Sequence, residues 1–255
     1  MTSIVYDGTY EGWLTAIFAI YDHKLTDVAF SRSEASTGSL FSRTHSVTTD
    51  EVKAERVLTG LRKRLSEEGM TRLYKTFLSD LDRPDDMMWS FVSHVFASAQ
   101  NVEEDYAHPA VWAVKQAAKR VQREAHRMEA FVRFKLTSDQ LYYALIEPDC
   151  DVLGLICPHF ESRYADQHWL IYDAKRRYGI YYDLEKATTV TLGVQDGRTN
   201  RTGLVAEISD EGEAFYQELW RRYFKSVTID ARKNKRLQLQ HMPKRYWRYL
   251  TEKMP

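Results

Sequence analysis

The sequence predicts an α+β fold in which a helical N-terminal half packs on a mostly antiparallel sheet, with further helices at the C-terminus. Two observations lead to this prediction. Up to about residue 128, apolar residues recur every three or four positions, as in amphipathic helices. Beyond that point come short stretches rich in β-branched and aromatic residues, bounded by turn residues. Because no Pro- or Gly-rich linker interrupts the 255 residues, we expect a single domain over 1–255, with a helical lobe at 1–128 and a sheet lobe at 129–255.

The N-terminal part begins with a short alternating strand, "SIVYD" at residues 3–7, and Thr9 can cap the helix that follows. Residues 31–48 are rich in Ser and Thr and predict a loop, with a strand over 40–47. Thr48 and Glu51 have the spacing of a capping box for the next helix. Two further helices are expected over 70–79 and 85–99. The residues expected in the core are Trp13, Ile17, Trp89 and Val121.

A longer helix is expected from Pro109, a residue that suits the first helical turn. Its apolar positions step by three and four residues, so one face is predicted to be buried. These positions are Val111, Val114, Ala118, Val121, Ala125 and Met128.

The sheet half is expected to contain five strands, within residues 129–136, 141–148, 168–173, 178–183 and 187–194. Residues 173–179 are typical of a hairpin connection. Helices are expected over 152–164 and 210–224. Near the end, Leu237 and Leu239 alternate with polar residues as in a short strand, and Pro243 can start a final helix.

Charge is segregated along a chain whose formal net charge is zero. Residues 1–110 hold 11 basic and 17 acidic side chains, and residues 111–136 hold 7 and 2. Residues 137–219 hold 7 and 15, whereas residues 220–255 hold 11 and 2. Because a polyanion is attracted by the local field, the two basic blocks predict a nucleic-acid interface. Its candidate residues are Lys119, Arg120, Arg123, Arg127, Arg232, Lys233, Lys235, Arg236, Lys244, Arg245 and Arg248.

Aromatic residues lie among the C-terminal charges, and two interpretations of them stay open. Tyr246 and Trp247 either stack on exposed bases or anchor the final helix in the core. For Trp247 we favour the anchor, since a short helix needs a large apolar contact to dock.

A segment of carboxylates and histidines is the candidate for direct chemistry on DNA. Its residues are Glu147, Asp149, Asp151, His159, Asp166 and His168. Oxygen and nitrogen ligands of this kind suit a divalent metal. The spacing matches no recognised metal motif, so no metal site is assigned, and turn chemistry is the competing interpretation.

Several classes of protein are not indicated. Cys150 and Cys157 suit neither a disulfide framework nor a zinc knuckle. The sequence lacks nucleotide-binding and hydrolase signatures and a three-cysteine cluster motif, so we expect no cofactor. No signal peptide is evident, and apolar runs such as Leu14–Tyr21 are too short to cross a bilayer. We therefore expect a cytoplasmic protein without membrane contact.

Several long motifs resemble a bacterial family described as DNA metabolism or DNA repair proteins, which contains a domain of unknown function. They are "YDGTYEGWLTAIF" (6–18), "HRMEAFVRF" (126–134), "EPDCDVLGLICPHFESRYADQHWLIYD" (147–173), "RYGIYYD" (177–183) and "LWRRYFKSVTIDARKNKRLQLQHMPKRYW" (219–247). The resemblance implies DNA as a partner, together with a radical S-adenosylmethionine (SAM) protein that is usually encoded nearby. In some relatives a similar segment is fused to a uracil-DNA-glycosylase-like domain. It implies no catalytic residues.

Three hypotheses follow. The first is a DNA-binding accessory protein in repair or modification, acting with the radical SAM enzyme. The second is a metal-dependent enzyme acting directly on DNA through residues 147–173. The third is an assembly module whose basic surface docks on an acidic protein.

Overall fold

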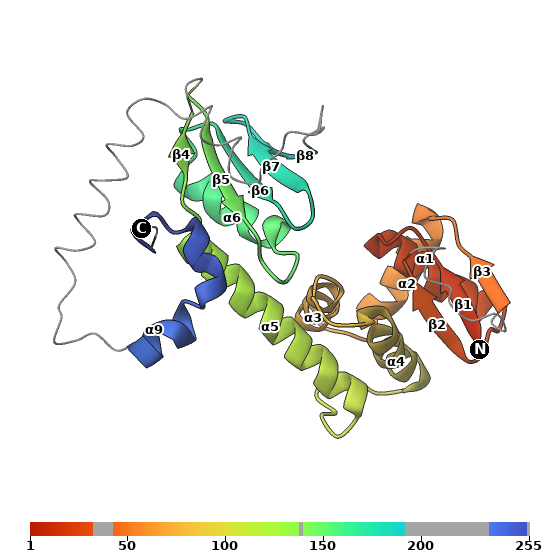
Figure 1. Ribbon diagram of the computed structural model, residues 1–255. Coiled ribbons are helices and arrows are strands. Elements are labelled where there is room, and N and C mark those ends of the chain that lie inside the picture. Colours follow the sequence, from red (N-terminus) through yellow and green to blue (C-terminus); the bar gives the residue numbers. More distant parts are fainter. Residues whose placement is uncertain (33–42, 138–139, 192–234, 254–255) are drawn as a thin grey trace. The chain divides into compact units, whose positions relative to one another are not determined.

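The computed structural model describes residues 1–32, 43–137, 140–191 and 235–253 of the chain (Figure 1). It has a mixed α+β fold, which confirms the predicted fold class. Contacts within the chain cluster into two compact units, Met1–Gln122 and Arg123–Pro255, and each unit is described by itself. This clustering does not decide how many parts fold independently, so the single-domain prediction stays a prediction.

The first unit contains a parallel sheet that the sequence analysis did not predict. Its strands β1 (Thr2–Val5), β2 (Val28–Ser31) and β3 (Arg43–Ser46) lie in the order β2-β1-β3. Helix α1 (Tyr10–Asp22) connects β1 to β2, as parallel strands require a crossover. Strands were expected at residues 3–7 and 40–47, close to β1 and β3, but β2 and the pairing of the three strands were not predicted. Strands of only four residues carry too little pattern to reveal which of them pair.

The helices of this unit begin near the predicted positions. The Thr9 hydroxyl accepts a hydrogen bond from the Gly12 N–H at 2.9 Å and caps α1. Helix α2 (Glu51–Arg62) is capped by Asp50, whose carboxylate accepts from the N–H groups of Val52 and Lys53. The predicted Thr48 cap is wrong, because the residue directly before the helix reaches two of its free N–H groups. Helices α3 (Glu67–Phe77) and α4 (Pro84–Ala97) follow.

The predicted core residues are confirmed with one exception. Trp13, Ile17 and Val121 are fully buried. Trp89 is only half-buried, because its ring packs against that of Tyr21, which is itself 49% exposed.

Helix α5 (Pro109–Phe131) starts at the predicted proline and buries all six predicted apolar positions. It also continues through residues expected to begin a strand. Glu129, Ala130 and Phe131 are helical, since neither Gly nor Pro stops the helix before them. The strand predicted over 129–136 is consequently reduced to β4 (Lys135–Leu136).

The second unit contains a five-stranded sheet in the order β4-β5-β6-β7-β8, seen in Figure 1 with α6 against it. The remaining elements are β5 (Tyr142–Ile146), α6 (Leu153–Arg163), β6 (Trp169–Asp173), β7 (Tyr178–Tyr182) and β8 (Ala187–Val190). β5 and β6 are parallel and are joined through α6, and the other neighbouring pairs are antiparallel. The mostly antiparallel sheet and the hairpin between β6 and β7 are thus confirmed.

The C-terminal part forms α9 (Lys235–His241) and two 3₁₀ helices, η3 (Lys244–Tyr249) and η4 (Thr251–Lys253). The strand expected around Leu237 and Leu239 is wrong: Leu and Gln are strong helix formers, and here propensity outweighs alternation. The helix predicted over 210–224 lies outside the described residues. Within the described ranges, no helix has the length and apolarity needed to cross a bilayer.

Candidate nucleic-acid interface

The C-terminal segment is anchored by Tyr246 and Leu250. Tyr246 is 2% exposed, Leu250 is fully buried, and the Tyr246 ring lies 5.6 Å from that of Phe131 at the end of α5. Trp247 is half-buried, and its Nε1 donates to the Met242 carbonyl at 3.1 Å. The core-anchor interpretation therefore applies to Tyr246 rather than to Trp247, the residue favoured for this role from the sequence.

The cations of the same segment point outward. Arg236, Lys244, Arg245 and Arg248 are all exposed. Arg236 and Lys244 make no ion pair with another described residue. Since Pro243 and the anchors fix the backbone of η3, its basic side chains are displayed from an ordered helix rather than a loose tail.

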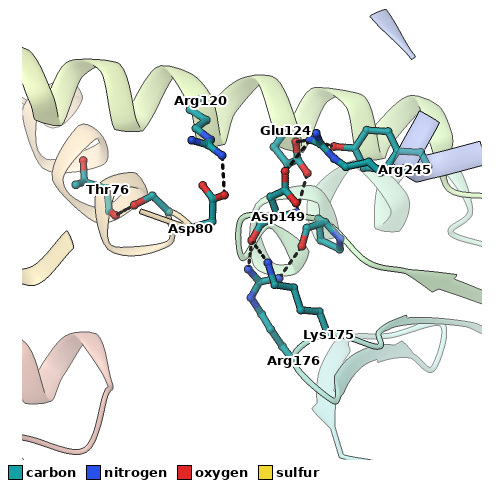
Figure 2. Close-up of polar contacts among 11 residues, drawn as sticks. Thr76, Asp80, Arg120, Glu124, Asp149, Lys175, Arg176 and Arg245 are labelled. Carbon is teal, nitrogen blue, oxygen red and sulfur yellow. Dashed lines mark hydrogen bonds and ion pairs between the residues drawn. The ribbon is translucent and has the colours of Figure 1, made fainter. Parts of the chain in front are cut away.

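The other two cations pair with acidic residues of the loop between β5 and α6. Arg245 lies 3.0 Å from Asp149 of this loop, and Arg248 pairs with Glu147 of the same loop. Arg245 also lies 2.9 Å from Glu124, which belongs to α5 (Figure 2). Burial acts against the charge of Arg245, but the neighbouring Tyr246, Glu124 and Asp149 raise the pKa of its guanidinium overall. Two of the predicted phosphate ligands are therefore already engaged with carboxylates.

The acidic loop is itself held by the hairpin between β6 and β7 (Figure 2). Arg176 donates to the Pro148 carbonyl at 3.1 Å and to the Asp149 carbonyl at 2.5 Å, and Lys175 donates to the Asp149 carbonyl at 3.1 Å. The Arg176 guanidinium also lies 2.7 Å from Asp173, whose carboxylate is fully buried. The loop carboxylates are consequently presented by backbone that basic side chains hold in place.

The third loop carboxylate, Asp151, accepts a hydrogen bond from the Tyr178 hydroxyl. Burial and the adjacent Asp151 raise the pKa of Tyr178 well above its usual value. The phenol therefore stays protonated and serves as a donor.

The candidate catalytic residues are only partly gathered. Glu147, Asp149 and Asp151 share one loop, whereas His159 and Asp166 are exposed at other positions. His168 precedes β6, and its Nδ1 lies 3.3 Å from the Tyr181 hydroxyl. Among the residues that the structure describes, no three His, Cys, Asp or Glu side chains form a group that could hold a metal ion.

The basic block on α5 spans both units. In the first unit, Lys119 is exposed and Arg120 pairs with Asp80 at 2.6 Å, as Figure 2 shows. In the second unit, Arg123 is exposed and Arg127 donates to the Gln240 carbonyl at 3.3 Å. That last hydrogen bond joins the two basic blocks, because it brings the end of α5 to α9.

Three other candidates are not placed. Arg232 and Lys233 lie outside the described residues, and for Lys235 only the backbone of α9 is described.

Three residues of this site, Glu124, Arg176 and Tyr178, were not predicted from the sequence. A signal existed for Glu124, which lies three residues after Val121 and four before Met128, within the buried stripe of α5. A carboxylate buried in that position needs a charged or hydrogen-bonding partner, and Arg245 supplies it. For Arg176 and Tyr178 no comparable signal is visible, because turn residues are usually solvated.

Comparison with known families decides the relationship of the chain. The model of DUF4130, a domain of unknown function, matches residues 82–252. The chain belongs to this family. The match covers the five-stranded sheet, the acidic loop between β5 and α6, and the C-terminal cations. The candidate interface is therefore part of the DUF4130 domain.

No curated protein matches the chain. One solved structure with similarity to the chain is that of the pGpG-specific phosphodiesterase PggH from Vibrio cholerae. It is 9% identical, with 89% of this chain and 99% of that chain covered, and the TM-score is 0.36. A likeness of this degree carries no inference about activity.

Proposed function

We propose that the protein binds nucleic acid through its basic C-terminal surface, as an accessory protein in DNA repair or modification. This surface consists of Arg127, Arg236, Lys244, Arg245 and Arg248. The proposal depends on which side chains of the C-terminal segment are buried and which are exposed. Tyr246 and Leu250 are buried and anchor the segment. The exposed side chains are the cations Arg236, Lys244, Arg245 and Arg248. A segment folded in this way presents point charges to phosphates.

The intramolecular ion pairs do not remove Arg245 and Arg248 from this role. The Arg245 side chain is 41% exposed and that of Arg248 is 58% exposed. The contacts of these guanidinium groups with Asp149 and Glu147 are worth only about 0.2–1 kcal/mol, so a phosphate can replace these two carboxylates. The Glu124 carboxylate is only 4% exposed and keeps its pair with Arg245. Until then, the loop keeps both guanidinium groups positioned.

The test is the salt dependence of binding to a labelled duplex, measured by fluorescence anisotropy. If about five phosphates are neutralised, the slope of log affinity against log salt is expected near −4 to −5. Replacing Arg236, Lys244 and Arg248 together by Ala should weaken binding to all sequences and bring the slope about three units closer to zero.

A matched control removes three cations from the first unit. Lys53 and Arg56 are exposed on α2 and Lys63 is exposed directly after it, and joint replacement of the three by Ala changes the net charge equally. The proposal predicts that this control binds like the wild type. Affinity that is flat between low and moderate salt, or equal losses in both triple variants, contradicts it.

The radical SAM partner rests on the family resemblance and is part of the same proposal. Co-expression with the neighbouring radical SAM protein, followed by size-exclusion chromatography, should give one complex. The metal-dependent alternative gains no support, since Glu147, Asp149 and Asp151 are each bonded to a guanidinium or a phenol.

A further inference from the structure

The two faces of the five-stranded sheet differ in chemistry. One face packs on α6: Trp169 and Ile171 are almost fully buried, and the Trp169 ring meets that of Phe160 at 6.2 Å. The opposite face carries three tyrosines from three adjacent strands. They are Tyr143 on β5, Tyr172 on β6 and Tyr181 on β7, and each is half-buried.

Strand register places these tyrosines in two neighbouring rows. In the first row, Leu170 pairs with Tyr143 on one side and with Tyr181 on the other. In the second row, Tyr172 pairs with Gly179, and a Cβ atom added at this glycine would lie 3.1 Å from the Tyr172 ring. The missing side chain therefore leaves space into which the Tyr172 ring leans. The three phenols therefore share one face, with Tyr143 and Tyr181 on either side of Leu170 and Tyr172 in the next row.

The charges on this face suit a polyanion. Although residues 137–219 hold 15 acidic side chains, the described strand residues of this face include no Asp or Glu. Lys135 pairs in register with Tyr143 and has no ion-pair partner among the described residues. At the other end, the exposed His168 lies parallel to Tyr181, with centroids 6.3 Å apart and an interplanar angle of 6°.

The protonation state of Tyr143 supports the same view. Burial, with Tyr172 nearby, raises the pKa of Tyr143 to about 12. The Tyr143 phenol is therefore neutral under physiological conditions and does not repel phosphates.

We propose that this tyrosine face binds single-stranded nucleic acid, whose unpaired bases stack on the Tyr143, Tyr172 and Tyr181 rings. Bases in a duplex cannot reach a flat sheet, whereas splayed bases can lie on it with their phosphates near cations at its margin. The inference rests on the proposed function and deepens it, since it specifies the strand form and the residues that read it.

The experiment measures the affinity of the Tyr172→Leu and Tyr181→Leu variants for single-stranded and for duplex oligonucleotides. Leucine keeps apolar contact but loses the aromatic face, so single-strand affinity is expected to fall by roughly 5- to 150-fold per lost stack. Duplex affinity and its salt slope should not change. Tyr74→Leu, at a 41% exposed tyrosine of the first unit, is the matched control and should bind both forms like the wild type.

Photocrosslinking guards against misfolded variants. A 5-bromouracil oligonucleotide irradiated with the wild-type protein should label peptides from β5, β6 or β7. The tyrosine face is not the binding site if single-strand affinity is unchanged in both variants. The same conclusion follows if the crosslinked peptides come only from other parts of the chain. Failure of the proposed function differs: the wild type would then bind neither strand form in a salt-dependent way.

Discussion

At the scale of single residues, the contribution of a basic side chain to phosphate binding depends on whether it is already paired with a carboxylate. Arg245 and Lys244 are adjacent in the chain and both exposed. Lys244 is unpaired among the described residues, whereas Arg245 lies between Glu124 and Asp149. We infer that Asp149 and Glu147 compete with phosphates for the guanidinium groups of Arg245 and Arg248.

This competition predicts variants that bind more tightly. Glu147→Gln keeps the shape of the loop and releases Arg248, whereas Asp149→Asn removes one of the two carboxylates that pair with Arg245 and leaves Glu124 in place. DNA affinity should therefore rise by up to about 5-fold in each variant, the equivalent of about 1 kcal/mol for a pair with an exposed guanidinium group. Anisotropy titration at low salt measures the change. Asp166→Asn alters the net charge equally at an exposed residue that makes no such contact with another described residue, and it should have a smaller effect. Equal gains in all three variants would show that only net charge matters.

At the scale of elements, η3 shows how an anchor and a display surface share six residues. A 3₁₀ helix turns every three residues, so Tyr246 and Tyr249 lie on one side while Lys244 and Arg248 lie elsewhere. Only Tyr246 and the following Leu250 reach the core. The docking of this element on α5 should therefore depend on one ring.

We expect Tyr246→Ala to lower the free energy of unfolding by about 3 kcal/mol or more, since a buried aromatic side chain is lost. Trp247→Ala should cost about 1 kcal/mol, because its ring is half-buried and it gives up one hydrogen bond. Urea denaturation of both variants measures the difference. If Trp247→Ala lowers the free energy of unfolding as much as Tyr246→Ala does, or more, then Trp247 also anchors the segment and the assignment to Tyr246 alone is wrong.

At the scale of the whole molecule, the segregation of charge is hidden by a net charge of zero and an isoelectric point near 7.1. Eleven basic and two acidic side chains in residues 220–255 create a positive local field although the net charge of the chain is zero. Binding to a polyanion should consequently be insensitive to the sign of the net charge.

A heparin column run at pH 8, above the isoelectric point, tests this statement. The wild type should be retained and eluted by salt, although its net charge is then slightly negative. The variant lacking Arg236, Lys244 and Arg248 should elute earlier, and the α2 variant lacking Lys53, Arg56 and Lys63 should elute with the wild type. Passage of the wild type without retention would mean that the acidic blocks screen the basic surface.

The sequence alone predicted those features that depend on neighbours along the chain. The apolar stripe of α5 and the short β-branched and aromatic runs of β5, β6 and β7 are local signals, so these elements were placed within a few residues. Charge segregation is likewise a property of composition. The sequence also indicated four residues of the site, as members of two unrelated sites. Arg245 and Arg248 belonged to the basic block, and Glu147 and Asp149 to the segment of carboxylates and histidines.

Only the tertiary structure decided what these residues do, because their partners are distant in sequence. Arg245 meets Glu124 across 121 positions, and Arg248 meets Glu147 across 101. The pairing of β1 with β3 and the alignment of Tyr143 with Tyr181 through Leu170 depend equally on strand order. Periodicity tells which face of an element is buried but not which element will face it, since that choice is made by the path of the whole chain.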